Sequence, residues 1–268
     1  MNTRTSAIAG LLVLAALSGM ADRALADLAP VAQSRTMLAR SQGAVFNPSF
    51  GGFLESQTNA VSWAATGFGP PEQTELLSAT GSGTSNGQTF TTQNSVLGLF
   101  EVTASGSSRN EGSTPSTTVP ASGGEGNSLF SYTFLVSAPM QVRLVGFVAR
   151  SDSGMGFSPF GNSTQSATVR LVNGAGTALA SHAVQAAPFY INVEAEHVAG
   201  EPFDDVFSLS AGQYTIEAQA LTTLVNGRGA LVSFGEFDLR LTVVPGPAGA
   251  GLLALAGLAA ARRRRAMA

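Results

Sequence analysis

The densest cluster of ionisable side chains in this sequence is the acidic stretch EAEHVAGEPFDD at residues 194–205. Glu194 and Glu196 lie two residues apart, so on a strand they would share a face, while His197 would point away. Paired carboxylates can act as general acid and base in glycoside hydrolysis, or bind calcium through hard oxygen ligands. Asp204 and Asp205 are the further candidate ligands. Because the stretch lacks a complete calcium loop and any HExxH spacing, the sequence favours a solvated acidic loop over a metal site or a hydrolase.

Other catalytic patterns are missing from the order of residues. The two histidines, His182 and His197, are not accompanied by a G-x-S-x-G elbow, and the chain has no Walker motif and no dinucleotide fingerprint. It has no cysteine, so it carries neither a thiol nucleophile nor a disulfide. We therefore expect a protein that is not an enzyme, with calcium as the one cofactor its carboxylates could bind. Asp152 is a weaker calcium candidate.

The charge balance argues against nucleic acid as a partner. Acidic residues number 17 against 14 basic ones, giving a formal net charge of −3, and all the basic residues are arginines. Four of those arginines are adjacent at the C-terminus, at residues 262–265. The remainder of the chain is therefore more strongly acidic, which disfavours contact with a phosphate backbone.

Aromatic side chains that could stack on sugars are few. Trp63 is the only tryptophan, and Tyr190 is the only tyrosine outside a clear strand pattern. They are the candidate contacts for a carbohydrate ligand, although each residue type is more often part of a core. Trp63→Ala would abolish saturable glycan binding if the carbohydrate-binding hypothesis is correct.

The elements that would position these residues are β-strands. Apolar and polar residues alternate through Phe130–Val136, again through Met140–Val148 after the Ala138-Pro139 break, and through the final segment Ala230–Val244. We expect the first two segments to pair as an antiparallel ladder. The segment ATVRLV-NGAG-TALASHAV at residues 167–184 predicts a hairpin. The final segment should bury Leu231, Phe237, Leu239, Leu241 and Val243.

Short, turn-bounded strands of this kind predict an all-β fold, an antiparallel β-sandwich that is jelly-roll-like, followed by a short C-terminal hydrophobic helix. Further strands are expected at residues 45–53, 58–65, 96–104, 206–209 and 214–220. The Gly/Ser/Thr-rich run at residues 105–127 predicts a flexible insertion. We favour one domain over residues 27–244, because residues 27–104 show too few strands to close a separate core; two small domains are the alternative.

The N-terminus has the three parts of a secretory signal. Arg4 supplies a positive charge, residues 7–17 form a short apolar core, and Ala24-Leu25-Ala26 is a small-x-small cleavage site. The sequence therefore predicts a signal peptide over residues 1–26, with cleavage before Asp27. Cleavage after Ala21 and retention as an anchor are the alternatives.

The C-terminus combines a turn, an apolar segment and a basic block. Val244, Pro245, Gly246 and Pro247 form an extended joint, because proline cannot continue a strand or sit inside a helix. Residues 248–261 are apolar and would span only about 21 Å as a helix, against about 30 Å for the hydrocarbon core of a bilayer. The cluster of Arg262, Arg263, Arg264 and Arg265 is the kind of positive block that stays on the cytoplasmic side of a membrane.

This order of parts resembles the PEP-CTERM sorting signal, although Gly246 stands where that family usually has Glu. The segments NSLFSYTFLVSAP, ATVRLVNGAGTAL, FSLSAGQYTIEAQA and GALVSFGEFDLRLTVVP, within residues 127–245, are similar to β-sandwich domains that often precede such tails. The resemblance implies a tail over residues 245–268 that is transiently anchored in the inner membrane of a Gram-negative bacterium. It also implies an exosortase-like processing enzyme as a partner, and an association with exopolysaccharide. A plain C-terminal membrane anchor is the alternative.

Together these features favour an exported, surface-targeted structural or interaction protein of the extracellular matrix. The second hypothesis is a carbohydrate-binding, lectin-like module. The third is a secreted polysaccharide hydrolase that uses Glu194, Glu196 or Asp205.

Overall fold

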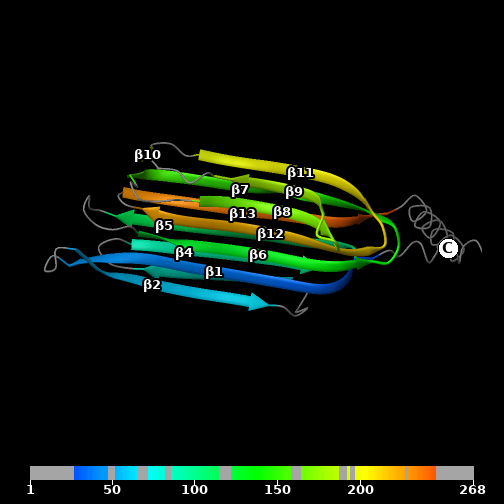
Figure 1. Ribbon diagram of the computed structural model, residues 1–268, viewed down its shortest axis with the longest axis horizontal. Coiled ribbons are helices and arrows are strands. Elements are labelled where there is room, and N and C mark those ends of the chain that lie inside the picture. Colours follow the sequence, from blue (N-terminus) through cyan, green and yellow to red (C-terminus); the bar gives the residue numbers. More distant parts are fainter. Residues whose placement is uncertain are drawn as a thin grey trace, which may run out of the picture.

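The chain folds into two stacked layers of long antiparallel strands (Figure 1). This computed structural model describes residues 27–47, 52–65, 72–81, 86–114, 122–157, 164–186, 192–193, 197–226 and 229–245. The six-stranded sheet has the spatial order β2 (Gly52–Ala65), β1 (Ala29–Asn47), β6 (Ser122–Val136), β12 (Gly212–Asn226), β8 (Thr164–Asn173) and β9 (Ala178–Gln185). The seven-stranded sheet has the order β10 (Asn192–Val193), β7 (Met140–Phe157), β13 (Gly229–Val244), β5 (Glu101–Thr114), β4 (Asn86–Leu97) and β3 (Glu72–Gly81), and β11 (His197–Leu209) also pairs with β7.

The prediction of an all-β antiparallel sandwich is confirmed, while the finer jelly-roll assignment stays a prediction. The expected C-terminal hydrophobic helix falls at residues 248–261, outside the described residues. Within the described ranges, no helix has the length and hydropathy needed to cross a bilayer.

The predicted hairpin is present as β8 and β9, which pair antiparallel from Ser166 opposite Gln185 to Val172 opposite Ala178. Its turn is closed by Asn173, whose Oδ1 accepts hydrogen bonds from the backbone N–H groups of Ala175 (3.0 Å) and Thr177 (2.9 Å). Gly176 in this turn has φ of 79°, a left-handed conformation that glycine adopts without steric cost. Local turn chemistry therefore set this pairing.

The expected ladder between Phe130–Val136 and Met140–Val148 is wrong. The two segments belong to β6 and β7, which lie in opposite sheets. The link through Ser137–Pro139 is thus an arch from one layer to the other. The physical reason is burial, because each strand has one apolar face and the arch lets these two faces pack against each other.

The expected flexible insertion at residues 105–127 is also wrong where the structure describes it. Residues 105–114 continue β5 and residues 122–127 begin β6, while 115–121 lie outside the described residues. The strand expected at residues 96–104 instead contains the turn Gly98–Phe100 between β4 and β5. Likewise, residues 197–205 of the acidic stretch form part of β11 rather than a loop. In each case backbone pairing with neighbouring strands outweighed a composition that is poor in strand formers.

The interior between the sheets has two halves along the strand direction. The apolar half is the large cluster of buried hydrophobic side chains from the second parts of β6 and β13 and the first parts of β7 and β12. Its fully buried members include Phe130, Tyr132, Phe134, Leu144, Ile216 and Phe237. Tyr132 buries its hydroxyl there and donates a hydrogen bond to the backbone oxygen of Leu28 (3.1 Å). This half supplies most of the hydrophobic stabilisation of the described residues.

The polar half lies toward the opposite ends of the same strands. Its inward-facing residues include Thr89, Thr91, Ser108, Asn110, Ser128, Thr222 and Ser233, all fully buried. Asn110 Nδ2 donates hydrogen bonds to Thr222 O and Thr222 Oγ1, both at 2.9 Å, and Asn110 Oδ1 accepts one from the Thr89 hydroxyl. The hydroxyls of Ser108 and Thr222 bond to each other across the two sheets.

Glycine residues allow the two sheets to come close together in the polar half. A Cβ atom at Gly126 would collide with Ser108 Oγ, and one at Gly124 would collide with Thr89 Oγ1, both on the facing sheet. Because Ser and Thr are too short to fill a normal inter-sheet gap of about 10 Å, glycine lets the sheets approach until the hydroxyls meet.

Both ends of the described chain lie at one end of the sandwich, which we call the exit end. It consists of residues 27–31, 98–100, 137–139, 210–211 and 244–245. The backbone N–H of Leu28 bonds to Leu99 O (2.8 Å), and the N–H of Val243 bonds to Phe100 O (2.9 Å). The turn between β4 and β5 thus joins the beginning of the first strand to the end of the last one (Figure 1).

Candidate functional site

Several predicted site residues lie outside the described residues. These are Tyr190, Glu194, Glu196, the sorting residues Gly246, Pro247 and Arg262–Arg265, and the cleavage-site residues Ala24 and Ala26. Trp63 is described at the level of its backbone, which lies in β2 opposite Met37. Val244 ends β13, and the exposed Pro245 follows it.

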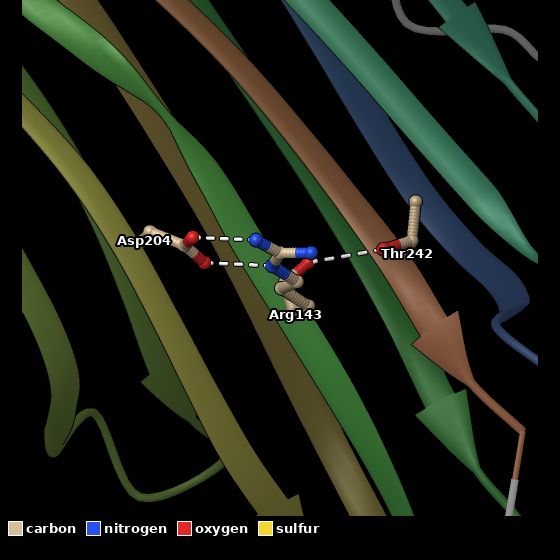
Figure 2. Close-up of polar contacts among 3 residues, drawn as sticks. All are labelled: Arg143, Asp204 and Thr242. Carbon is tan, nitrogen blue, oxygen red and sulfur yellow. Dashed lines mark hydrogen bonds and ion pairs between the residues drawn. The ribbon is translucent and has the colours of Figure 1, made fainter.

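Asp204 and Asp205, the two carboxylates proposed as calcium ligands, point to opposite faces of β11. Asp204 lies on the outer face and accepts two hydrogen bonds from Arg143 of β7, from Nε at 2.7 Å and from Nη2 at 2.5 Å (Figure 2). Figure 2 also shows Thr242 Oγ1 of β13 directed at the backbone oxygen of Arg143 (3.4 Å). The hydrogen bonds and charge of Arg143 lower the pKa of Asp204. The two adjacent carboxylates therefore do not converge on one ligand.

Asp205 instead takes part in a cluster at the seam between the two sheets, formed by His182, Glu201, Phe203 and Asp205. His182 faces inward from β9, the edge strand of the six-stranded sheet. Its Nδ1 lies 3.0 Å from Glu201 Oε1 and its Nε2 lies 2.7 Å from Asp205 Oδ2, both on β11. Each ring nitrogen of His182 thus lies within hydrogen-bonding distance of one carboxylate of β11.

Phe203 completes the seam cluster. Its ring stacks on the His182 ring with centroids 4.3 Å apart and an interplanar angle of 11°. Phe203 is buried and packs with the apolar half, so the cluster caps the open side of the core. Inward-pointing charged residues at sheet edges also discourage pairing with other chains. The seam cluster is thus suited to close and protect the sandwich.

The second group of side chains that could take part in binding or catalysis is a carboxylate pair on the outer face of the seven-stranded sheet. Glu236 and Asp238 are two residues apart on β13, so their side chains lie on the same face. Burial raises the pKa of Glu236, and the charge of Asp238 raises it further. Burial also raises the pKa of Asp238.

The neighbours of this pair in the sheet are mostly small or aromatic. Ala149 of β7 and Ser107 of β5 lie opposite Glu236, and Phe147 and Ser105 lie opposite Asp238. Phe147 is partly exposed and so presents ring surface beside the carboxylates. Carboxylates beside an exposed ring and small hydroxyls suit hydrogen bonding and stacking with a polyhydroxylated ligand.

Among the residues the structure describes, no group of three or more His, Asp or Glu side chains is arranged to hold a metal ion. Of the residues named for the hydrolase hypothesis, Asp205 is hydrogen-bonded to His182.

Sequence reasoning did not assign roles to His182, Glu201, Glu236 or Asp238. A signal for His182 was present, because strand alternation places it on the same face as Ala180 and Val184, where a polar residue is unexpected. Its partners could not have been found this way, since β9 and β11 belong to different sheets.

No protein-family model matches the chain, and no curated protein matches it. Among solved structures, the chain aligns with the enzymatically active domain of bacteriophage CBA120 tailspike protein 4 at 11% identity and a TM-score of 0.21, covering 64% of this chain and 19% of that one. It aligns with the VP2 subviral particle of infectious bursal disease virus at 11% identity and a TM-score of 0.18, covering 90% and 74%. It aligns with the CBM22-1 xylan-binding domain of Paenibacillus barcinonensis Xyn10C at 14% identity and a TM-score of 0.16, covering 45% and 74%. These scores are too low to carry an argument about fold, ligand or activity.

Proposed function

We propose that this chain is an exported interaction protein displayed at the surface or in the extracellular matrix of a Gram-negative bacterium, where an exosortase-like enzyme processes its C-terminal tail. The observation that carries the proposal is that the first and last described residues of the sandwich lie together at the exit end. Leu28 and Val243 each hydrogen-bond to the single turn at Leu99–Phe100.

This arrangement suits display. The predicted signal peptide precedes Asp27 and the predicted sorting tail follows Val244, so both membrane-directed segments leave from the same end of the sandwich. The opposite end then points away from the membrane, and both outer faces stay available to partners. Pro245, the last described residue, is exposed, and the Pro-Gly-Pro sequence at residues 245–247 cannot continue a strand, which favours access of a processing enzyme to the backbone.

The experiment that tests this proposal is intact-mass spectrometry of the protein recovered from its native host, separated into membrane, surface and medium fractions. We expect an N-terminus at Asp27 and, in the surface or medium fraction, a C-terminus near residues 245–247. A chain that keeps Arg262–Arg265 and stays in the membrane fraction contradicts the sorting hypothesis and makes the tail a plain anchor.

Carbohydrate binding is the second candidate, and the outer face of the seven-stranded sheet favours it. There Glu236 and Asp238 lie beside the partly exposed Phe147. The host exopolysaccharide should bind saturably, as measured by calorimetry or on a glycan array, and Phe147→Ala should weaken binding. The matched control is Gln213→Ala, on the outer face of the six-stranded sheet, which should bind unchanged. Equal effects of both variants, or no saturable binding, contradict this candidate.

A further inference from the structure

The exit end is almost free of charge. Among its residues, at 27–31, 98–100, 137–139, 210–211 and 244–245, only Asp27 is ionisable. The nearby Glu101 is held by Arg240, with Nε of the arginine 2.8 Å from Glu101 Oε1. In contrast, ionisable side chains lie along the outer faces, as in the pairs Arg143–Asp204 and Arg170–Glu217. Such an end can approach a low-dielectric surface without a large cost of desolvating charge.

Large apolar side chains are exposed at or beside this same end. The relative exposures are 51% for Leu99, 50% for Phe100, 48% for Val31 and 44% for Leu135. Leu99 and Phe100 are adjacent at the tip of the β4–β5 turn, and Leu135 pairs with Ala29 close to the start of β1. Clustered exposed apolar side chains mark surfaces that contact a membrane or another protein.

The chain length between this end and the tail fixes how far apart they can be. Val243, whose N–H bonds to Phe100 O, is five residues before Ala248, where the apolar tail segment begins. A fully extended chain spans about 3.4 Å per residue, so Val243 lies within about 17 Å of that segment. Two prolines in this interval further restrict the joint. If residues 248–261 enter a bilayer, Leu99 and Phe100 are therefore held near its surface.

We propose that the exit end rests on the lipid surface while the tail is anchored, with Leu99 and Phe100 inserted among the lipid headgroups. This inference rests on the proposed function, because it requires the tail to enter the membrane. It goes further in assigning a lipid-contacting role to a turn of the folded domain. The outer faces of both sheets would then stand roughly perpendicular to the membrane. Cleavage at the joint would remove the anchor and allow the turn at Leu99–Phe100 to leave the lipid surface.

The full-length chain permits a direct test, because it has no native cysteine and a single one can be introduced and labelled. Phe100→Cys and Leu99→Cys place an environment-sensitive fluorophore such as NBD at the exit end. The matched control is Val198→Cys, at an apolar residue that is 67% exposed on β11 and pairs with Ser151, far along β7 from its first residue Met140. Each labelled chain is mixed with vesicles of phosphatidylethanolamine and phosphatidylglycerol, with and without nitroxide-labelled lipids.

We expect all three labelled chains to float with the vesicles. The labels at residues 99 and 100 should shift to shorter emission wavelengths and lose intensity with nitroxide lipids, while the label at residue 198 should show neither change. If the chains float but all three labels stay in water, the inference is wrong and the proposed anchoring survives. If the chains do not float, both are wrong. A blue shift at residue 100 that needs no vesicles and grows with protein concentration would assign this surface to a second copy instead, and would also overturn the inference.

Discussion

The two halves of the interior stabilise the same sandwich by different means. In the apolar half, side chains such as Phe130, Phe134 and Phe237 bury hydrocarbon between the sheets. In the polar half, Asn110 is bonded to Thr222 of the facing sheet and to Thr89 of the neighbouring strand β4, and Ser108 also bonds to Thr222 across the sheets. Apolar burial is roughly proportional to area and tolerates imperfect geometry, whereas each buried hydrogen bond requires a specific partner. The halves should therefore respond differently to substitution.

The boundary between the halves is visible at Gly106 of β5. A Cβ atom there would collide with Ser128 Oγ, which belongs to the polar half, and with the Phe237 ring, which belongs to the apolar half. Near this residue the interior thus changes from aromatic packing to direct hydrogen bonds between the sheets. This comparison yields four predictions.

The largest effect should come from Phe237→Ala in the apolar half. Phe237 is fully buried, and truncating such a ring removes its burial and leaves a cavity, so we expect a loss of about 3–5 kcal/mol in the free energy of unfolding. Urea unfolding followed by circular dichroism measures it. A loss below about 1 kcal/mol would mean that the apolar half does not dominate stability.

Asn110→Ala should have the next largest effect, and it tests whether the polar half depends on its hydrogen bonds. The substitution leaves the Thr89 and Thr222 hydroxyls without this partner, and we expect a loss of about 2–3 kcal/mol in the free energy of unfolding. The matched control is Ser95→Ala, because buried Ser95 Oγ makes no hydrogen bond to the described residues. The control should be neutral or stabilising by roughly 1 kcal/mol, since it removes a desolvated hydroxyl. Equal losses for both variants would contradict the hydrogen-bond account.

His182→Ala tests the seam cluster, which closes the side of the apolar half. We expect a loss of about 1–2 kcal/mol in the free energy of unfolding, because Glu201 and Asp205 lose their shared hydrogen-bonding partner and Phe203 loses its stacked ring. Hydrogen exchange should accelerate in β9 and β11 more than in β12. Ser181→Ala, an exposed neighbour on β9, is the control and should leave exchange unchanged. Uniform acceleration over all strands would indicate that the seam has no local role.

Glu236→Gln should have the smallest effect on the free energy of unfolding. It should raise this free energy, whereas the three substitutions above lower it. The pKa of Glu236 is raised in the folded state, so its contribution to stability is full below the unfolded pKa and is lost as pH rises through the folded value. At neutral pH the amide should therefore raise the free energy of unfolding, and it should flatten the fall in stability as the pH rises above the ordinary pKa of a glutamate. Thr242→Val is the control on the same face. An unchanged pH profile in the Glu236 variant would show that its carboxyl is not perturbed.

The sequence predicted the strands whose inward positions are apolar. The final strand was assigned correctly over residues 230–244, and Leu231, Phe237, Leu239 and Leu241 are buried as expected, with Val243 partly buried. The β8–β9 hairpin was assigned from its Asn-Gly turn. On β4, the second part of β5 and the first part of β6 the buried positions are Ser, Thr, Asn, Gln and Gly, so the alternation of apolar and polar residues disappears there. Residues 105–114 and 122–127 therefore resembled a loop although they are paired strands.

The candidate sites were predictable to a smaller extent. Adjacent residues on a strand face opposite ways, which could have excluded a joint site for Asp204 and Asp205 once residues 197–209 were known to be a strand. The seam cluster combines residues from β9 and β11. The carboxylate pair Glu236 and Asp238 on β13 has its neighbours on β7 and β5. Such clusters depend on strand order, which no local pattern encodes.

The sequence by itself determined the all-β class, the faces of the apolar strands and the one hairpin with specific turn chemistry, because these depend on residue order over a few positions. Only the tertiary structure decided which sheet each strand joins. For example, β6 and β7 follow each other in the sequence but lie in opposite sheets instead of pairing. The tertiary structure also brought Leu28 and Val243 to one turn and set Asn110 between two sheets. The physical reason is that burial and cross-sheet hydrogen bonds are satisfied by the whole assembly of strands, and many strand orders are compatible with the same local alternation.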